Sequence, residues 1–140
     1  MSESRDLLRK YTYRWYDEVW NERRTGAIEM FMVEDTEHEQ TGRKWPFFKS
    51  EFKSFHDHML AAFPDLWFCV EEVIVDGDWS SARFIASGTH LGNAEGLPSA
   101  TGRKFEVAGC VMIRWEQGKA VETLYNYDQV GLLKQIGVIN

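Results

Sequence analysis

The spacing of apolar residues changes at Phe63-Pro64, and this change divides the chain into two parts. Before it, apolar side chains recur every three or four residues, as on one face of a helix. After it, apolar and polar residues alternate, as in a half-buried strand. The sequence therefore predicts an α+β domain in which helices come first and a sheet follows.

Three helices are predicted in the first part, over residues 4–21, 25–32 and 46–63. The first has one apolar stripe that ends with Trp15 and Val19, and the third is strongly amphipathic, with Phe52 and Phe55 on its apolar side. A proline fits the first turn of a helix, which suits Pro46 at the start of the third.

Four strands are predicted in the second part, over residues 66–75, 79–90, 104–115 and 119–127. Asp76-Gly77 suits a tight hairpin turn, so neighbouring strands should run antiparallel. The connection 91–103 is long and rich in glycine, which makes it a candidate lid, and a short helix around Leu132 ends the chain. We expect helices to cover one face of a curved, mostly antiparallel sheet and to leave a cone open at one end.

Composition excludes several classes of protein. The chain has 140 residues, of which 44% are hydrophobic, enough for the core of one domain spanning 1–140. Its net charge is −6 and its basic residues are scattered, so neither a nucleic acid nor a membrane is an expected partner. Cys69 and Cys110 each lie in an apolar stretch and are expected to be buried. Without a signal-like or membrane-spanning segment, the expected location is cytoplasmic.

Short motifs along almost the whole chain resemble the SnoaL-like polyketide cyclases of the nuclear-transport-factor-like superfamily. They are Val19-Trp20-Asn21, His38-Glu39, Phe63-Pro64-Asp65-Leu66, Gly77-Asp78, Arg83, Gly88-Thr89-His90-Leu91-Gly92, Ala100-Thr101-Gly102-Arg103, Gly118-Lys119, Asp128, Gly131-Leu132-Leu133 and Gln135-Ile136-Gly137. The resemblance implies a cone-shaped α+β barrel wrapped over three N-terminal helices, usually as a homodimer. It also implies a pocket that closes a polyketide ring by an intramolecular aldol condensation without metal or cofactor.

The resemblance assigns the acid/base role to an acidic side chain at the end of the last strand, and the matching residue is Asp128. Two departures from the family pattern bear on the shape of the substrate. Leu124 stands where the family often has an aromatic residue, and Ala120 occupies the position of the usual apolar residue after Gly118-Lys119. This scaffold hosts many functions, so the activity has to be argued from the site.

Strand alternation puts Asp128 on one face with Glu122, Leu124 and Asn126, and we expect this polar face to line the pocket. A carboxyl group among aromatic residues has a raised pKa, which suits general acid/base chemistry. Asp128 also precedes the last helix, where aspartate is a favoured N-cap. Both roles stay open.

Two further polar residues lie on the strand 79–90. His90 is a candidate catalytic residue at the pocket mouth, where it would orient or protonate an oxygen, or else a strand-end histidine bonded to loop backbone. Arg83 is expected inside, paired with Glu122 or Asp128, either in the substrate site or as a structural ion pair.

His38 lies in an acidic tract, but four histidines without a repeated ligand spacing argue against a metal site. We therefore expect no metal, and the family resemblance implies that no cofactor is needed either. We interpret His38 as a residue of the pocket mouth or an anchor of its loop, which the resemblance modestly favours.

Aromatic residues could line an apolar cavity for a flat or acyl ligand, although core packing explains most of them equally well. The candidates are Trp15, Phe52 and Phe55, followed by Tyr11, Phe31, Phe48, Trp67 and Phe84. The predicted strands also carry Trp79, Trp115, Tyr125 and Tyr127. Those that face away from the helices would form an exposed apolar surface prone to association. Such a surface predicts a homodimer through the outer sheet face.

The sequence thus favours a small enzyme that performs cofactor-free acid/base chemistry on a carbonyl or polyketide-like compound. Isomerisation, dehydration or hydrolysis would need the same groups as cyclisation. The alternative is a non-catalytic module that binds an apolar ligand or a protein.

Overall fold

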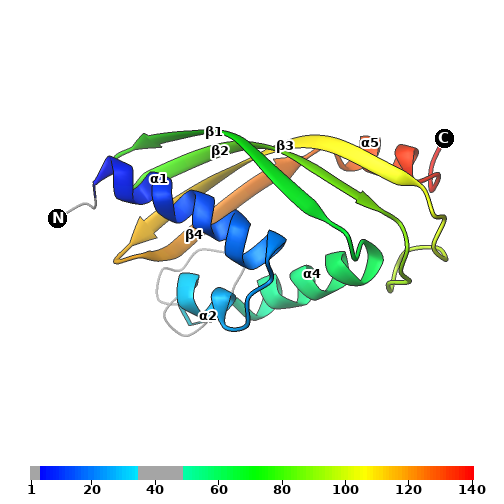
Figure 1. Ribbon diagram of the computed structural model, residues 1–140, viewed down its shortest axis with the longest axis horizontal. Coiled ribbons are helices and arrows are strands. Elements are labelled where there is room, and N and C mark those ends of the chain that lie inside the picture. The colour runs from blue at the N-terminus through cyan, green and yellow to red at the C-terminus, as the bar shows by residue number, and fades with distance from the viewer. Residues whose placement is uncertain (1–3, 35–48) are drawn as a thin grey trace.

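The computed structural model describes residues 4–34 and 49–140, and it confirms the α+β arrangement with four antiparallel strands (Figure 1). In chain order the elements are α1 (Arg5–Arg14), the π-helix η1 (Trp15–Asn21), α2 (Ala27–Phe31), α4 (Lys49–Ala62), β1 (Trp67–Asp76), β2 (Trp79–Thr89), β3 (Lys104–Glu116), β4 (Lys119–Tyr127) and α5 (Gln129–Gln135). The strands follow one another across the sheet in the order β1-β2-β3-β4.

The strand bounds agree with the predicted ones to within about a residue because turn chemistry fixes them. Gly77 and Gly118 occupy the hairpin turns with φ of 60° and 78°, a left-handed backbone that favours glycine. Both hairpins therefore reverse the chain where the sequence predicts.

The sheet is open, with β1 and β4 as its edges in the part of the chain described. The helices α1, α2 and α4 lie on one face of this curved sheet in Figure 1. The expected cone is thus not closed by strands. Instead, the helices cover the concave face, and the core forms between the two layers.

The first predicted helix has a different second half. After Arg14 it continues as η1, in which the backbone N–H of Glu22 donates to the carbonyl oxygen of Asp17, five residues earlier, at 2.7 Å. The wider turn lets Trp15, Tyr16, Val19 and Trp20 all be buried. Two of these, Tyr16 and Trp20, lie outside the single stripe predicted for an α-helix. Single-turn π segments occur frequently at functional sites.

Alternation along the strands decides which side chains face the helices. On β2, Ala82 and Phe84 point inward, so Arg83 between them is exposed, and the prediction that it is interior is wrong. Cys69 and Cys110 are exposed for the same reason, which corrects the expectation that both are buried.

Asp65 ties the start of β1 to the end of β2. Its Oδ1 accepts a hydrogen bond from the backbone N–H of Thr89 and its Oδ2 accepts one from the Thr89 hydroxyl, both at 2.7 Å. Partial burial opposes ionisation of the carboxyl group, but the hydrogen bonds, together with the nearby charge of Lys104, outweigh it and hold the pKa of Asp65 below its ordinary value of 3.8.

This lowered pKa predicts a pH-dependent loss of stability in Asp65→Asn. A carboxylate with a depressed folded pKa stabilises the fold above its unfolded pKa, and the stabilisation is lost as the pH falls through the folded pKa. At pH 7 we expect the free energy of unfolding to fall by about 1 kcal/mol, because Asp65 is exposed and solvent screens its carboxylate. Urea denaturation across the acid range should show the free energies of unfolding of wild type and variant converging as the pH falls. A difference that stays the same at all pH values would contradict this prediction. The control is Asp57→Asn, at an exposed position on α4.

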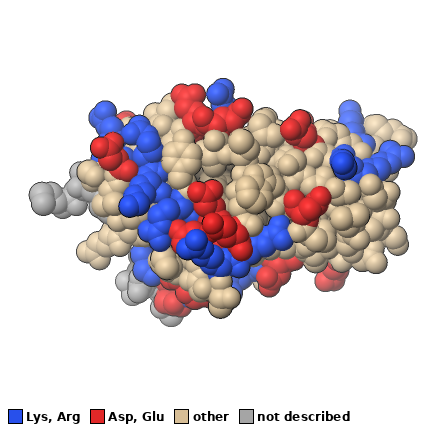
Figure 2. All heavy atoms as spheres, in the orientation of Figure 1, with Lys and Arg blue, Asp and Glu red and all other residues tan. Residues whose placement is uncertain are grey.

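Charges of both signs are mixed on the face seen in Figure 2. Arg14 pairs with Glu18 at 2.6 Å, and Lys53 pairs with Glu29 at the same distance. Ion pairs of this kind and the mixture of colours in Figure 2 both argue against a large field of one sign on this face. In the described ranges, no helix is long and apolar enough to cross a membrane.

Candidate functional site

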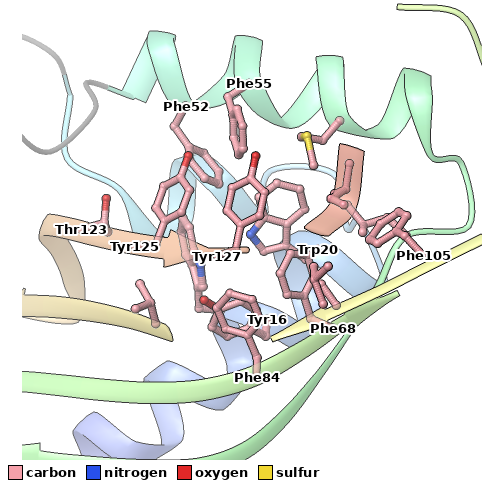
Figure 3. Close-up of a pocket in the computed structure, with 17 residues that line it drawn as sticks. Tyr16, Trp20, Phe52, Phe55, Phe68, Phe84, Phe105, Thr123, Tyr125 and Tyr127 are labelled. Carbon is pink, nitrogen blue, oxygen red and sulfur yellow. The ribbon is translucent and has the colours of Figure 1, made fainter. Parts of the chain in front are cut away.

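A cavity of about 50 Å³ lies between the concave face of the sheet and the helices η1 and α4 (Figure 3). Its volume is several times the minimum that holds one water molecule, roughly 10–15 Å³. The residues that line it are Trp15, Tyr16, Trp20, Phe52, Phe55, Met59, Leu66, Phe68, Phe84, Ala86, Phe105, Val107, Val111, Thr123, Tyr125, Tyr127 and Leu132. We call this cavity the pocket.

Trp20 is at the centre of the aromatic wall. Its ring centroid lies 5.7 Å from that of Phe52 and 6.0 Å from that of Phe55, both with edge-to-face geometry. It also lies 5.0 Å from Phe68 on β1. These contacts join η1, α4 and the sheet, so the wall of the pocket is also part of the hydrophobic core.

The polar groups of the wall include hydroxyls from Tyr16 on η1 and from Thr123, Tyr125 and Tyr127 on β4. Burial raises the pKa of Tyr16 and Tyr125 well above the ordinary tyrosine value, and it also raises the pKa of Tyr127. These phenols therefore stay protonated at neutral pH, as neutral hydrogen-bond donors. Among the described residues, the wall contains no carboxylate, imidazole or basic side chain.

Asp128 does not line the pocket. It is exposed, and its Oδ1 accepts a hydrogen bond from the backbone N–H of Gly131 at 2.8 Å, which makes it the N-cap of α5. Leu124 and Asn126, on the same face of β4, are also exposed. The alternation was predicted correctly, but the opposite face of the strand, with Thr123, Tyr125 and Tyr127, is the one that faces the pocket.

Arg83 and Glu122 are not paired with each other, contrary to the prediction. The Arg83 guanidinium lies 3.6 Å from Glu71 and 3.5 Å from Glu72, on the outer face of the sheet. Glu122 is buried and its Oε1 accepts from Nε of Arg114 at 2.9 Å, across β3 and β4. Neither side chain lines the pocket.

His90 is fully buried at the end of β2, but it is not among the residues lining the pocket. Its Nδ1 lies 3.3 Å from the backbone nitrogen of Thr101, whose N–H it accepts, and its ring centroid lies 5.7 Å from that of Phe63. The hydrogen bond from Thr101 attaches the connection 91–103 to the end of the strand. This connection was predicted as a lid, but none of its residues lines the pocket. His38 falls outside the described residues.

Of the aromatic candidates, Trp15, Phe52, Phe55 and Phe84 line the pocket, and their role in binding a substrate stays a prediction. The sequence reasoning missed Tyr16, Trp20 and the inward residues of β1, β3 and β4. The missed strand residues carry a readable signal, since each alternates with polar or exposed neighbours. Tyr11 and Phe31 pack in the core instead, and Trp67 is 53% exposed on the outer face.

Comparison with known proteins agrees with this architecture. A model of the SnoaL-like polyketide cyclase family matches residues 10–136. A solved structure of a candidate SnoaL-like polyketide cyclase from Jannaschia sp. CCS1 superposes with a TM-score of 0.80 at 18% identity, covering 100% of this chain and 99% of that one. TsrD from Streptomyces laurentii gives 0.80 at 20% identity, covering 98% and 99%.

IdmH from Streptomyces antibioticus, also a candidate polyketide cyclase, gives a TM-score of 0.76 at 24% identity, covering 93% of this chain and 98% of that one. No protein of curated function is significantly similar in sequence. At these identities the structural likeness extends to the fold alone.

Proposed function

Because this chain belongs to the SnoaL-like polyketide cyclase family, we propose that it binds a small, uncharged, largely apolar carbonyl compound in the pocket and promotes closure of a ring within it. The observation that carries the proposal is the composition of the wall. Aromatic and aliphatic side chains make up almost all of it, and its described polar groups are neutral. A charged ligand would lose its hydration there without gaining a charged partner.

Ring closure by an aldol step conserves all atoms of the substrate. A carbon next to one carbonyl gives a proton to a base, the role predicted for Asp128 or His90, and bonds to the carbon of a second carbonyl. The oxygen of that second carbonyl becomes an alkoxide and takes up a proton, which regenerates the base. A shaped pocket favours this step by holding the two ends of a flexible chain together. The hydroxyls of Tyr16, Tyr125 and Tyr127 are protonated at neutral pH, the more so because burial raises their pKa, and they are suited to stabilise the developing alkoxide.

The proposal can be tested with 2,6-heptanedione, a flexible diketone that cyclises and loses water to give 3-methylcyclohex-2-enone. We expect the protein to accelerate formation of this enone above the rate in buffer, as measured by NMR. Unchanged rates would contradict the cyclase proposal for this substrate class. Binding of 2-naphthol, followed by calorimetry, reports separately on whether the pocket takes an aromatic ligand.

The acid/base roles of Asp128 and His90 remain a prediction. Asp128 stabilises α5 as its N-cap, and asparagine caps a helix about as well as aspartate. We therefore expect Asp128→Asn to keep the free energy of unfolding and Asp128→Ala to lower it by about 1 kcal/mol, as measured by urea denaturation.

The rate of enone formation separates the two roles of Asp128. If it is also the acid/base, Asp128→Asn abolishes turnover although the fold is intact. If Asp128 acts only as the N-cap of α5, Asp128→Asn leaves turnover unchanged.

A second candidate function is non-catalytic binding of an apolar ligand. The observation that favours it is the lack of an ionisable carboxylate or imidazole among the described residues of the wall. This function predicts that 2-naphthol binds while 2,6-heptanedione cyclises no faster than in buffer.

We also propose that the protein forms a homodimer through the outer face of the sheet. Ile74, Met112 and Leu124 are 61%, 48% and 39% exposed and, with Ser81, lie side by side in one row across all four strands. Exposed apolar side chains gathered on one sheet face commonly mark an interface, and here the small Ser81 separates Ile74 from Met112 and Leu124. We call Ile74, Met112 and Leu124 the outer apolar row; a second copy of the same row is its natural partner under two-fold symmetry.

A further inference from the structure

Thr123 carries a buried hydroxyl that has no hydrogen-bond partner in the described part of the chain. The residue is only 6% exposed, and it belongs to the wall of the pocket. Its neighbour across the strand pair is Ile113, which is fully buried and offers no polar side-chain atom. The hydroxyl therefore faces an apolar environment unless something else enters the pocket.

An unpaired buried hydroxyl is costly. Leaving a buried donor or acceptor unsatisfied costs the desolvation free energy of that group, whereas an apolar group of the same shape costs nothing of this kind. Valine has that shape and would fill the same space. Most buried polar groups of folded proteins are hydrogen-bonded, so an exception calls for a specific explanation.

The position of Thr123 supplies that explanation. In Figure 3 the hydroxyls of Thr123, Tyr125 and Tyr127 project from β4 to the same side; those of Tyr125 and Tyr127 point toward α4 and its residues Phe52 and Phe55, and Thr123 lies beyond Tyr125. Thr123 thus stands beside the aromatic wall, with its oxygen on the ligand side of the strand. A ring held against this wall could carry an oxygen within reach of Thr123.

We propose that the Thr123 hydroxyl forms a hydrogen bond with a neutral oxygen, a carbonyl or a hydroxyl, on a flat apolar ligand and so fixes the orientation of that ligand in the pocket. This inference rests on the proposed function, because it requires a ligand in the pocket. It adds the class of ligand: an uncharged ring compound that bears an oxygen at one end. Thr123 is a binding and specificity residue in this account.

A pair of probes that differ by one hydroxyl tests the inference. We would measure the dissociation constants of 2-naphthol and naphthalene for wild type, Thr123→Val and Thr123→Ser by calorimetry. Thr123→Val should weaken binding of 2-naphthol about fivefold, the effect of one neutral hydrogen bond, and leave binding of naphthalene unchanged. Thr123→Ser keeps the hydroxyl and should retain the preference for 2-naphthol.

Stability provides an independent readout. Because Thr123→Val removes an unsatisfied hydroxyl, the free energy of unfolding of the ligand-free protein should stay the same or rise. A clear fall would mean that the hydroxyl has a partner within the protein, which would overturn the inference. Thr123→Ala, which also lacks the hydroxyl, repeats the binding comparison if the valine variant does not fold.

The outcomes separate this inference from the function on which it rests. If both probes bind wild type and Thr123→Val weakens neither or weakens both equally, the role of Thr123 is wrong and the pocket remains a binding site. If neither probe binds wild type, the proposed binding function is wrong, and the inference is overturned with it.

Discussion

Trp20→Ala is expected to lower the free energy of unfolding by about 3–5 kcal/mol and to weaken binding of 2-naphthol about tenfold. The loss of stability follows from removing a large side chain that is only 5% exposed and that joins η1 to Phe52, Phe55 and Phe68. The loss of affinity follows because the same indole ring forms part of the pocket wall. Urea denaturation and calorimetry measure the two effects separately.

Trp115→Ala is the matched control for this variant. Trp115 is 1% exposed, and its indole N–H donates to the Ser80 hydroxyl at 2.9 Å, but it does not line the pocket. We expect a similar loss of stability with the affinity for 2-naphthol kept within about twofold. Equal losses of affinity for 2-naphthol in both variants would contradict the location of the binding site. If Trp20→Ala does not fold, Trp20→Phe replaces it in the same comparison.

Met112→Lys is expected to dissociate the proposed homodimer. Two-fold symmetry would bury two added charges in one interface, and unpaired buried charges are strongly unfavourable. The dissociation constant of the dimer should rise by roughly 100-fold or more, as measured by sedimentation across a range of protein concentrations. Since Met112 lies on the outer face, affinity of the pocket for 2-naphthol should not change.

Ser54→Lys is the control for this second variant. It adds the same charge at an exposed position on α4, away from the outer apolar row, and should leave the association unchanged. A wild-type protein that sediments as a monomer at all concentrations would overturn the dimer proposal. So would a Met112→Lys protein that associates as strongly as wild type.

Much of the fold was predictable because local rules determine it. The hairpin turns at Gly77 and Gly118, together with the alternation of apolar and polar residues along the chain, define the four strands almost to the residue. The π-helix was not predicted, because Trp15 and Val19 fit the stripe of an ordinary α-helix. The four bulky residues between positions 15 and 20 were the available signal, since one narrow stripe cannot hold them all.

The site was harder to predict because alternation gives two faces of a strand without saying which is inside. For β4 we expected Asp128 to face the pocket because of the family resemblance, and Glu122 with it because alternation puts both on one face. The tyrosines face it instead, since burying Tyr125 and Tyr127 removes more apolar surface from water. Arg83 was misplaced for a related reason, although its neighbours Ala82 and Phe84 already indicated an outward side chain.

The central claim is that an apolar ligand binds in the pocket between the sheet, η1 and α4. The most direct test records the indole N–H signals of the tryptophans in ¹⁵N-labelled protein while 2-naphthol is added. Trp15 and Trp20 line the pocket, whereas Trp67 is exposed on the outer face. The account predicts that the signals of Trp15 and Trp20 shift while that of Trp67 does not; a shift of Trp67 with the other two unchanged would contradict it.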